Sequence, residues 1–146
     1  MPETESILKV LCVDDNRDTA DSLAVLMQIA GFEAIACYDG ETALAAAAEF
    51  HPDVCVLDLN MPGIKGDELG RRVRAEQGNE NTTLVALTGL PEDVARERTR
   101  AAGFDLHLTK PVDPERLANT VIDIVILRTP SRSTPAIPWP AARTTA

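Results

Sequence analysis

Two patterns of hydrophobic and polar positions alternate along the chain. Short apolar runs are followed, five times over, by longer segments in which apolar residues recur every three or four positions. The short runs are typical of strands, and the longer segments are typical of helices. The predicted strands are Lys9–Val13, Glu33–Cys37, Val54–Leu57, Thr83–Leu87 and Leu106–Leu108. The predicted helices are 17–30, 39–50, 67–76, 91–102 and a last helix that Asp113 caps.

This alternation predicts the fold class. Parallel strands need crossover connections, so strands that alternate with helices indicate a parallel sheet. The third run, Val54–Leu57, is apolar at every position, as expected for a strand that is covered on both faces. The sequence therefore predicts an α/β fold: a (βα)5 chain with a doubly wound, five-stranded parallel sheet.

The pattern ends near residue 127. Residues 128–146 contain four of the ten prolines and no acidic residue. Such a composition is typical of linkers and free tails. We expect a folded domain over 1–127 and a Pro-rich tail over 128–146, with a docking motif at 138–140 (Pro-Trp-Pro) as the alternative.

Composition narrows the function classes. The chain has a net charge of −9, and because its last 19 residues hold three arginines and no acid, residues 1–127 carry −12. This acidity argues against nucleic-acid binding, which requires Lys/Arg surfaces. No segment approaches the ~20 apolar residues of a membrane span. The N-terminus does not resemble a signal peptide, and we expect a cytoplasmic protein.

The three cysteines agree with that location. Cys12, Cys37 and Cys55 lie in or beside apolar runs, and their spacing fits neither a metal site nor a complete disulfide framework. We expect buried, reduced thiols, as in a reducing compartment.

The candidate chemistry lies at the ends of the strands. Ligands of open parallel sheets bind beyond the carboxyl ends of the strands, where this chain has Asp14, Asp15, Asp58, Thr88 and Lys110. Clustered carboxylates repel one another unless a cation lies between them, and oxygen ligands suit Mg²⁺. A hydroxyl and an ammonium can bind a phosphoryl group, which a carboxylate can accept as a nucleophile. Each residue alone could be a cap, a turn or a solvated group, but their joint position favours phosphoryl chemistry.

Four segments at these positions closely resemble the motifs of response-regulator receiver (CheY-like) domains of two-component signalling. They are Val13-Asp14-Asp15-Asn16, Val56-Leu57-Asp58 with Met61-Pro62-Gly63, Ala86-Leu87-Thr88-Gly89 and Leu108-Thr109-Lys110-Pro111. The resemblance covers roughly residues 7–127. It implies a flavodoxin-like fold with strand order 2-1-3-4-5.

The resemblance also implies a role for each acidic residue. Asp58 would be the phosphoacceptor, and its donor would be a phosphohistidine of a histidine kinase or a histidine phosphotransfer protein. The Mg²⁺ ion would be held by Asp15, Asp14, Asp58 and the backbone carbonyl of Asn60. The protein would be a phosphoacceptor switch that assists its own phosphorylation and dephosphorylation, not an enzyme with a separate substrate.

Three further residues would bind the phosphoryl group or change conformation in response to it. Lys110 would contact its oxygens and precede a cis bond to Pro111. Thr88 would move toward it and shift the loop after the fourth strand. The family usually has Tyr or Phe on the fifth strand as the switch partner of this threonine, and this chain has a histidine, His107, at that position.

The output of the switch has two interpretations. Helix 91–102 is highly charged, which is typical either of a solvated face or, by resemblance to the family, of an interface with a downstream protein target. The chain would be a single-domain regulator or the receiver of a hybrid histidine kinase. Segment 102–114 resembles the receivers of hybrid histidine kinases.

Two alternatives use other chemistry: a phosphatase and a flavin-binding domain. Haloacid-dehalogenase-type phosphatases also have an aspartyl nucleophile after a strand, but they favour a second Asp two residues later, where this chain has Asn60. A flavin-binding domain needs a phosphate loop rich in small residues after the first strand. The acidic Asp14 and Asp15 would repel that phosphate.

Overall fold

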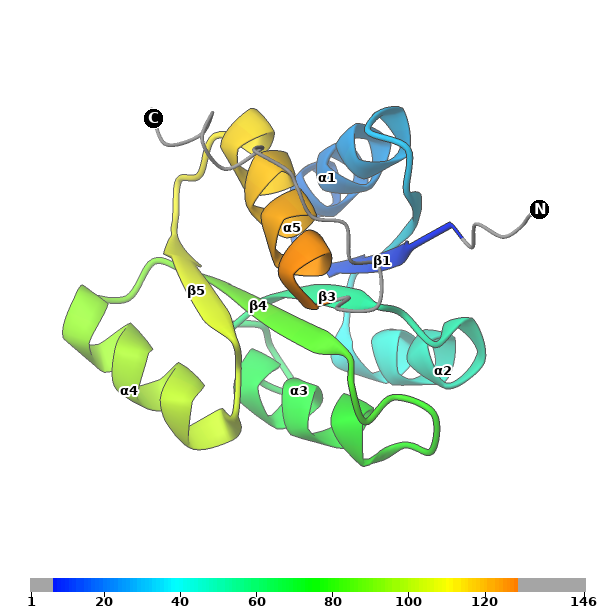
Figure 1. The fold of residues 1–146 in the computed structure, drawn as a ribbon. Helices are drawn as coiled ribbons and strands as arrows, with labels where there is room; N and C mark the ends of the chain where they lie inside the picture. Colours follow the sequence, from blue (N-terminus) through cyan, green and yellow to red (C-terminus); the bar gives the residue numbers. More distant parts are fainter. Residues whose placement is uncertain (1–6, 129–146) are drawn as a thin grey trace.

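The structure, a computed structural model, describes residues 7–128 as a five-stranded parallel sheet with helices on both faces (Figure 1). Its strands are β1 (Lys9–Val13), β2 (Glu33–Cys37), β3 (Val54–Asp58), β4 (Thr83–Thr88) and β5 (Leu106–Thr109). Its helices are α1 (Arg17–Ile29), α2 (Gly40–Phe50), α3 (Gly66–Ala75), α4 (Glu92–Ala102) and α5 (Pro114–Arg128). The order β2-β1-β3-β4-β5 confirms the predicted fold and topology.

Alternate residues of the central strands pack into two separate cores. Val10, Cys12, Val54 and Val56 lie on one face of the sheet with residues of α1 and α5. Their neighbours Leu11, Val13, Cys55 and Leu57 lie on the other face with residues of α2 and α3. Because successive strand residues point to opposite faces, a strand that is covered on both sides must be apolar throughout, as β3 is up to its last residue.

The helices are divided unequally between the two faces. Figure 1 shows α1 and α5 above the sheet and α2, α3 and α4 below it. α1 contacts α5, while α3 contacts both α2 and α4. The site-bearing edge is therefore flanked by α1 on one side and by the α3–α4 pair on the other.

The predicted boundaries agree with the structure to within a residue, and two of the differences concern the site. Asp58 and Thr88 are the last residues of β3 and β4, not the first residues after them. The ladder continues past both, because Leu59 N–H donates to Leu87 O and Lys110 N–H donates to Thr88 O, at 3.0 and 2.8 Å. The regular hydrogen bonding of the strands thus fixes the backbone positions of Asp58 and Thr88.

The end of the chain is only partly described. α5 extends to Arg128, and the predicted tail beyond it lies outside the described residues, so its nature stays a prediction. Within the described part, no helix is long and apolar enough to cross a membrane.

All three cysteines are free and buried, as predicted. Burial, with a smaller effect of the neighbouring Cys37, raises the pKa of the Cys12 thiol to about 12. Burial also raises the pKa of Cys55. These thiols stay protonated at neutral pH, and a protonated thiol is a poor nucleophile and metal ligand.

Candidate functional site

Three carboxylates meet at the carboxyl ends of β1 and β3. Oxygen atoms of Asp14, Asp15 and Asp58 all lie within 4.8 Å of one another. Asp14 and Asp58 are buried, whereas Asp15 is exposed. The predicted convergence of these residues is therefore present in the structure.

The backbone after each strand orients the two buried carboxylates. The N–H of Asn16 donates to Asp14 Oδ1 at 3.0 Å, and the N–H of Asn60 donates to Asp58 Oδ1 at 3.1 Å. Asn16 also caps α1 by accepting a hydrogen bond from Thr19 N–H. In both turns, one carboxylate oxygen is held by its own loop and the other, Oδ2, is directed toward Lys110.

Lys110 joins the two buried carboxylates. Its Nζ lies 3.3 Å from Asp14 Oδ2 and 3.3 Å from Asp58 Oδ2. Burial opposes the charged form of the lysine, but the carboxylates of Asp58 and Asp14 outweigh it and raise the pKa of Lys110. The peptide bond from Lys110 to Pro111 is cis, as predicted.

The cluster has the properties of a hard-cation site. Among the described residues, none donates a hydrogen bond to the buried Asp14 Oδ2, although Lys110 lies at ion-pair distance. A buried carboxylate oxygen that lacks a hydrogen bond is costly. One ammonium group does not neutralise three carboxylates. A divalent cation that prefers oxygen ligands therefore fits this set of side chains.

Thr88 lies at the same edge and is fully buried. Its hydroxyl oxygen accepts a hydrogen bond from Leu90 N–H at 2.9 Å, which closes the turn between β4 and α4. The hydroxyl is therefore engaged with its own loop, although its proton remains available to a second acceptor.

His107 lies away from the carboxylates. Its Nε2 is 3.3 Å from Glu92 Oε2, at the start of α4. It lines a groove of about 700 Å³ between α4, β5 and the segment before α5, together with Arg96, Arg100 and Arg116. The structure thus places the His107 side chain against the polar surface of α4. In the sheet, His107 is paired with Ala86, two positions before the Thr88–Thr109 pair on the same face.

A close backbone approach fixes the loop that follows Asp58. Gly66 begins α3 and donates its N–H to Leu59 O at 3.1 Å. A Cβ at Gly66 would lie 2.7 Å from Leu59 Cα and would overlap the carbonyl oxygen of Asp58. Glycine is therefore required at position 66 for the helix to start this close to the strand.

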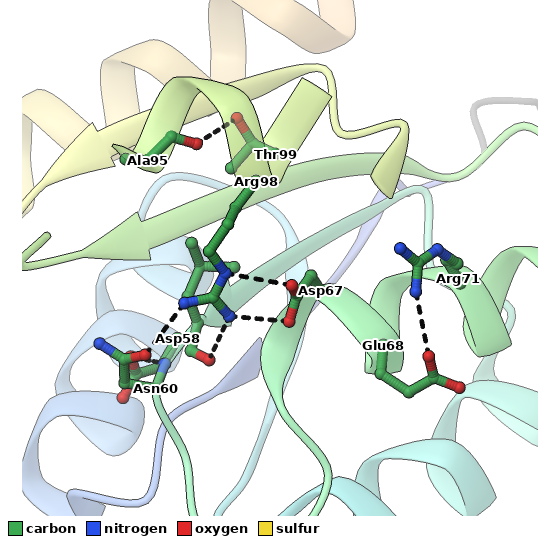
Figure 2. A network of polar contacts seen from close by, with 9 residues as sticks. Asp58, Asn60, Asp67, Glu68, Arg71, Ala95, Arg98 and Thr99 are labelled. Carbon is green, nitrogen blue, oxygen red and sulfur yellow. Dashed lines mark hydrogen bonds and ion pairs between the residues drawn. The ribbon is translucent and has the colours of Figure 1, made fainter. Parts of the chain in front are cut away.

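One residue near the site was missed by the sequence interpretation. Arg98 of α4 binds both carboxylate oxygens of Asp67 of α3, at 2.8 and 3.1 Å. The same guanidinium donates to Asn60 Oδ1 at 3.3 Å, two residues past Asp58 (Figure 2). In the sequence, Arg98 is only one of several charged residues of a helix, because no local spacing connects residues that are 31 and 38 positions apart.

Comparison with known proteins identifies the family. The model of the response regulator receiver domain matches residues 10–122. The virulence sensor protein BvgS of Bordetella pertussis is 37% identical over 123 residues, which are 81% of this chain and 10% of BvgS. The DNA-binding response regulator MtrA of Mycobacterium tuberculosis is 33% identical over 113 residues, 77% of this chain and 48% of MtrA. The chain therefore spans half or less of these relatives.

Solved structures agree with the match. The chemotaxis protein CheY4 of Vibrio cholerae superimposes with a TM-score of 0.77 at 32% identity, over 82% of this chain and 99% of CheY4. The BeF3-activated receiver domain of DrrB from Thermotoga maritima has a TM-score of 0.74 at 27% identity, over 83% of this chain and 99% of that domain. The phosphatase and flavin alternatives receive no support from these matches.

Proposed function

The chain belongs to the response regulator receiver domains, the phosphoacceptor switches of two-component signalling, and we propose that Asp58 is its phosphoacceptor. The observation that supports this most strongly is the position of Lys110, at 3.3 Å from both Asp14 and Asp58. A cation beside two carboxylates on one sheet edge is an arrangement for neutralising the charge of a phosphoryl group during transfer.

In the proposed reaction, a carboxylate oxygen of Asp58 forms a bond to the phosphorus of a phosphohistidine. The bond from that phosphorus to the histidine nitrogen breaks, and the electron pair leaves with the imidazole. Lys110 neutralises charge on the phosphoryl oxygens, and the Asn60 N–H keeps the Asp58 carboxylate oriented. Attack of water on the phosphorus would later release inorganic phosphate and restore the carboxylate.

We propose that the carboxylates of Asp14, Asp15 and Asp58, with the backbone carbonyl of Asn60, hold Mg²⁺. The unbonded Asp14 Oδ2 and the 4.8 Å cluster support this assignment. When bound, the ion would shield the incoming phosphoryl group from the carboxylates and polarise it. Thr88 would then donate a hydrogen bond from its hydroxyl to a phosphoryl oxygen, and the loop to α4 would follow it.

The partners follow from this role. The donor would be a histidine kinase or a histidine phosphotransfer protein, and the target would be a protein that binds the polar groove along α4 and β5. BvgS is named a sensor protein and MtrA a DNA-binding regulator, and this chain would be either the receiver of a hybrid kinase or a separate regulator. The acidic domain favours a protein target over nucleic acid, and the reduced thiols favour a cytoplasmic location.

The test uses a small phosphodonor. The protein is incubated with Mg²⁺ and acetyl phosphate, and its intact mass is measured. We expect one base-labile phosphoryl group per chain in the wild type and none in Asp58→Asn. Asp18→Asn, an exposed carboxylate in the first turn of α1, is the matched control and should be modified normally. Modification of Asp58→Asn would contradict the assignment, and continuous release of many phosphates per chain would indicate a phosphatase.

A further inference from the structure

Arg98 connects α4 to the loop that carries the phosphoacceptor. α4 buries Ala95, Thr99 and Ala102 against the domain. Arg98 is three residues after Ala95 and four before Ala102, so it lies on the same side of the helix. From there its guanidinium reaches α3 and the β3–α3 loop, whereas Arg96 pairs with Glu92 of its own helix at 2.8 Å.

The guanidinium is held mainly by Asp67. The two bonds to that carboxylate, at 2.8 and 3.1 Å, form a bidentate pair, which is the most directional ion pair available to arginine. The Arg98 and Asp67 side chains are 29% and 22% exposed. Because the ion pair with Asp67 fixes the position of the guanidinium, the guanidinium can also restrain a group to which it binds more weakly.

That partner is the loop beside Asp58. One nitrogen of Arg98 donates to Asn60 Oδ1 at 3.3 Å (Figure 2). Another nitrogen lies 3.5 Å from the backbone oxygen of Leu59. The backbone N–H of Asn60 in turn donates to Asp58 Oδ1 at 3.1 Å. A continuous chain of polar contacts thus runs from α3 and α4 through Asn60 to the carboxylate that reacts.

We infer that Arg98 is a positioning residue for the reaction at Asp58, acting through the side chain of Asn60; this inference rests on the proposed phosphorylation of Asp58. Holding Asn60 Oδ1 restrains the turn whose N–H orients the Asp58 carboxylate. Transfer to Asp58 and hydrolysis of its phosphoryl group both need in-line alignment at the same phosphorus, so both depend on that restraint. Arg98 itself touches no reacting atom.

The first test measures the rates in Arg98→Gln, which keeps hydrogen-bonding capacity but loses the charge and the bidentate geometry. At saturating Mg²⁺, we expect the maximal rate of phosphorylation by acetyl phosphate and the rate of phosphoryl loss each to fall about three- to tenfold. The acetyl phosphate concentration for half-maximal rate should stay unchanged, because Arg98 contacts no donor. Arg98→Lys, which keeps the charge but makes single contacts, should restore part of both rates.

The control is Arg71→Gln on the neighbouring helix α3. This substitution removes an exposed ion pair with Glu68, so both rates should remain within about twofold of the wild type. An equal effect of Arg71→Gln and Arg98→Gln would overturn the inference, since it would reflect the loss of one positive charge and not the contact with Asn60.

A double-mutant cycle separates positioning from simple attachment of α3 to α4. Asn60→Ala removes the side chain that Arg98 holds and leaves the backbone. In that background, Arg98→Gln should change either rate by less than about twofold. A full additional loss would mean that Arg98 acts only by joining the two helices, which overturns the inference. If the wild type itself is not phosphorylated, the proposed function fails; if it is and Arg98→Gln reacts normally, only the role of Arg98 fails.

Discussion

The hydroxyl of Thr88 accepts a hydrogen bond from the backbone N–H of Leu90, at 2.9 Å. This contact holds the β4–α4 turn against the end of the strand while the Thr88 side chain is fully buried. Any movement of the hydroxyl toward a group on Asp58 must therefore weaken the turn. The residue is a physical link between the site and the start of α4.

Thr88→Val tests this link, because valine has nearly the same shape and no hydroxyl. We expect acetyl phosphate to modify Asp58 still, with the rate within about tenfold, since one neutral hydrogen-bond donor is lost. Amide hydrogen exchange over 88–92 should respond to beryllium fluoride in the wild type and not in the variant. Thr109→Val, at the exposed paired position of β5, should keep the response. A full response in Thr88→Val would exclude the hydroxyl as the link.

The carboxylate cluster should lower the stability of the metal-free protein and provide a binding site for Mg²⁺. Without Mg²⁺, Asp15→Asn removes repulsion among three carboxylates that lie within 4.8 Å. We expect its Tm to rise by about 2–5 °C, a change on the order of 1 kcal/mol. Added Mg²⁺ should raise the Tm of the wild type and have little effect on the variant. The measurement is thermal unfolding with and without Mg²⁺, and equal Mg²⁺ stabilisation of both proteins would remove Asp15 from the site.

Gly66→Ala should disturb the loop after Asp58. The new Cβ would meet the backbone of Leu59 and Asp58, which cannot move aside as a side chain can. We expect a loss of about 1–3 kcal/mol in the free energy of unfolding together with slower phosphorylation. Gly89→Ala is the control for urea unfolding, because a Cβ there meets nothing within 4 Å. Equal stability of the two variants would contradict the close approach at Gly66.

The contact between Asp67 and Arg98 should make stability depend on pH in the acid range. Partial burial raises the pKa of Asp67, but the hydrogen bonds and charge of Arg98 outweigh it, so that the pKa lies below the usual 3.8. The folded state therefore binds fewer protons than the unfolded state at this group. The stabilisation is present above pH 3.8 and is lost as the pH falls through the lower, folded value.

Asp67→Asn lacks this stabilisation at every pH. Urea unfolding should show the wild type more stable by about 1 kcal/mol or less at pH 7, because the pair is partly exposed. The difference should shrink on acidification below about pH 4. Glu80→Gln, an exposed carboxylate outside this network, serves as the control. A difference that grows in acid would reverse the sign assigned to the pair.

Much of the fold could be predicted because its signals are local. The apolar run of β3 reports burial on both faces, and its alternation with helices requires parallel strands. Asp14, Asp58 and Lys110 could be assigned to one site because parallel strands end at a common edge, and their contacts in the structure bear out that convergence. The tail beyond residue 128 stays a prediction.

The sequence by itself thus determined the layers, the edge that carries chemistry and the family motifs, since these follow from periodicity and from residues next to strand ends. Only the tertiary structure decided that His107 pairs with Glu92, and that Arg98 reaches Asp67 and Asn60. These contacts join elements far apart in the chain, and the helix period leaves open which neighbour a charged side chain meets. They depend on how α3 and α4 pack on the sheet.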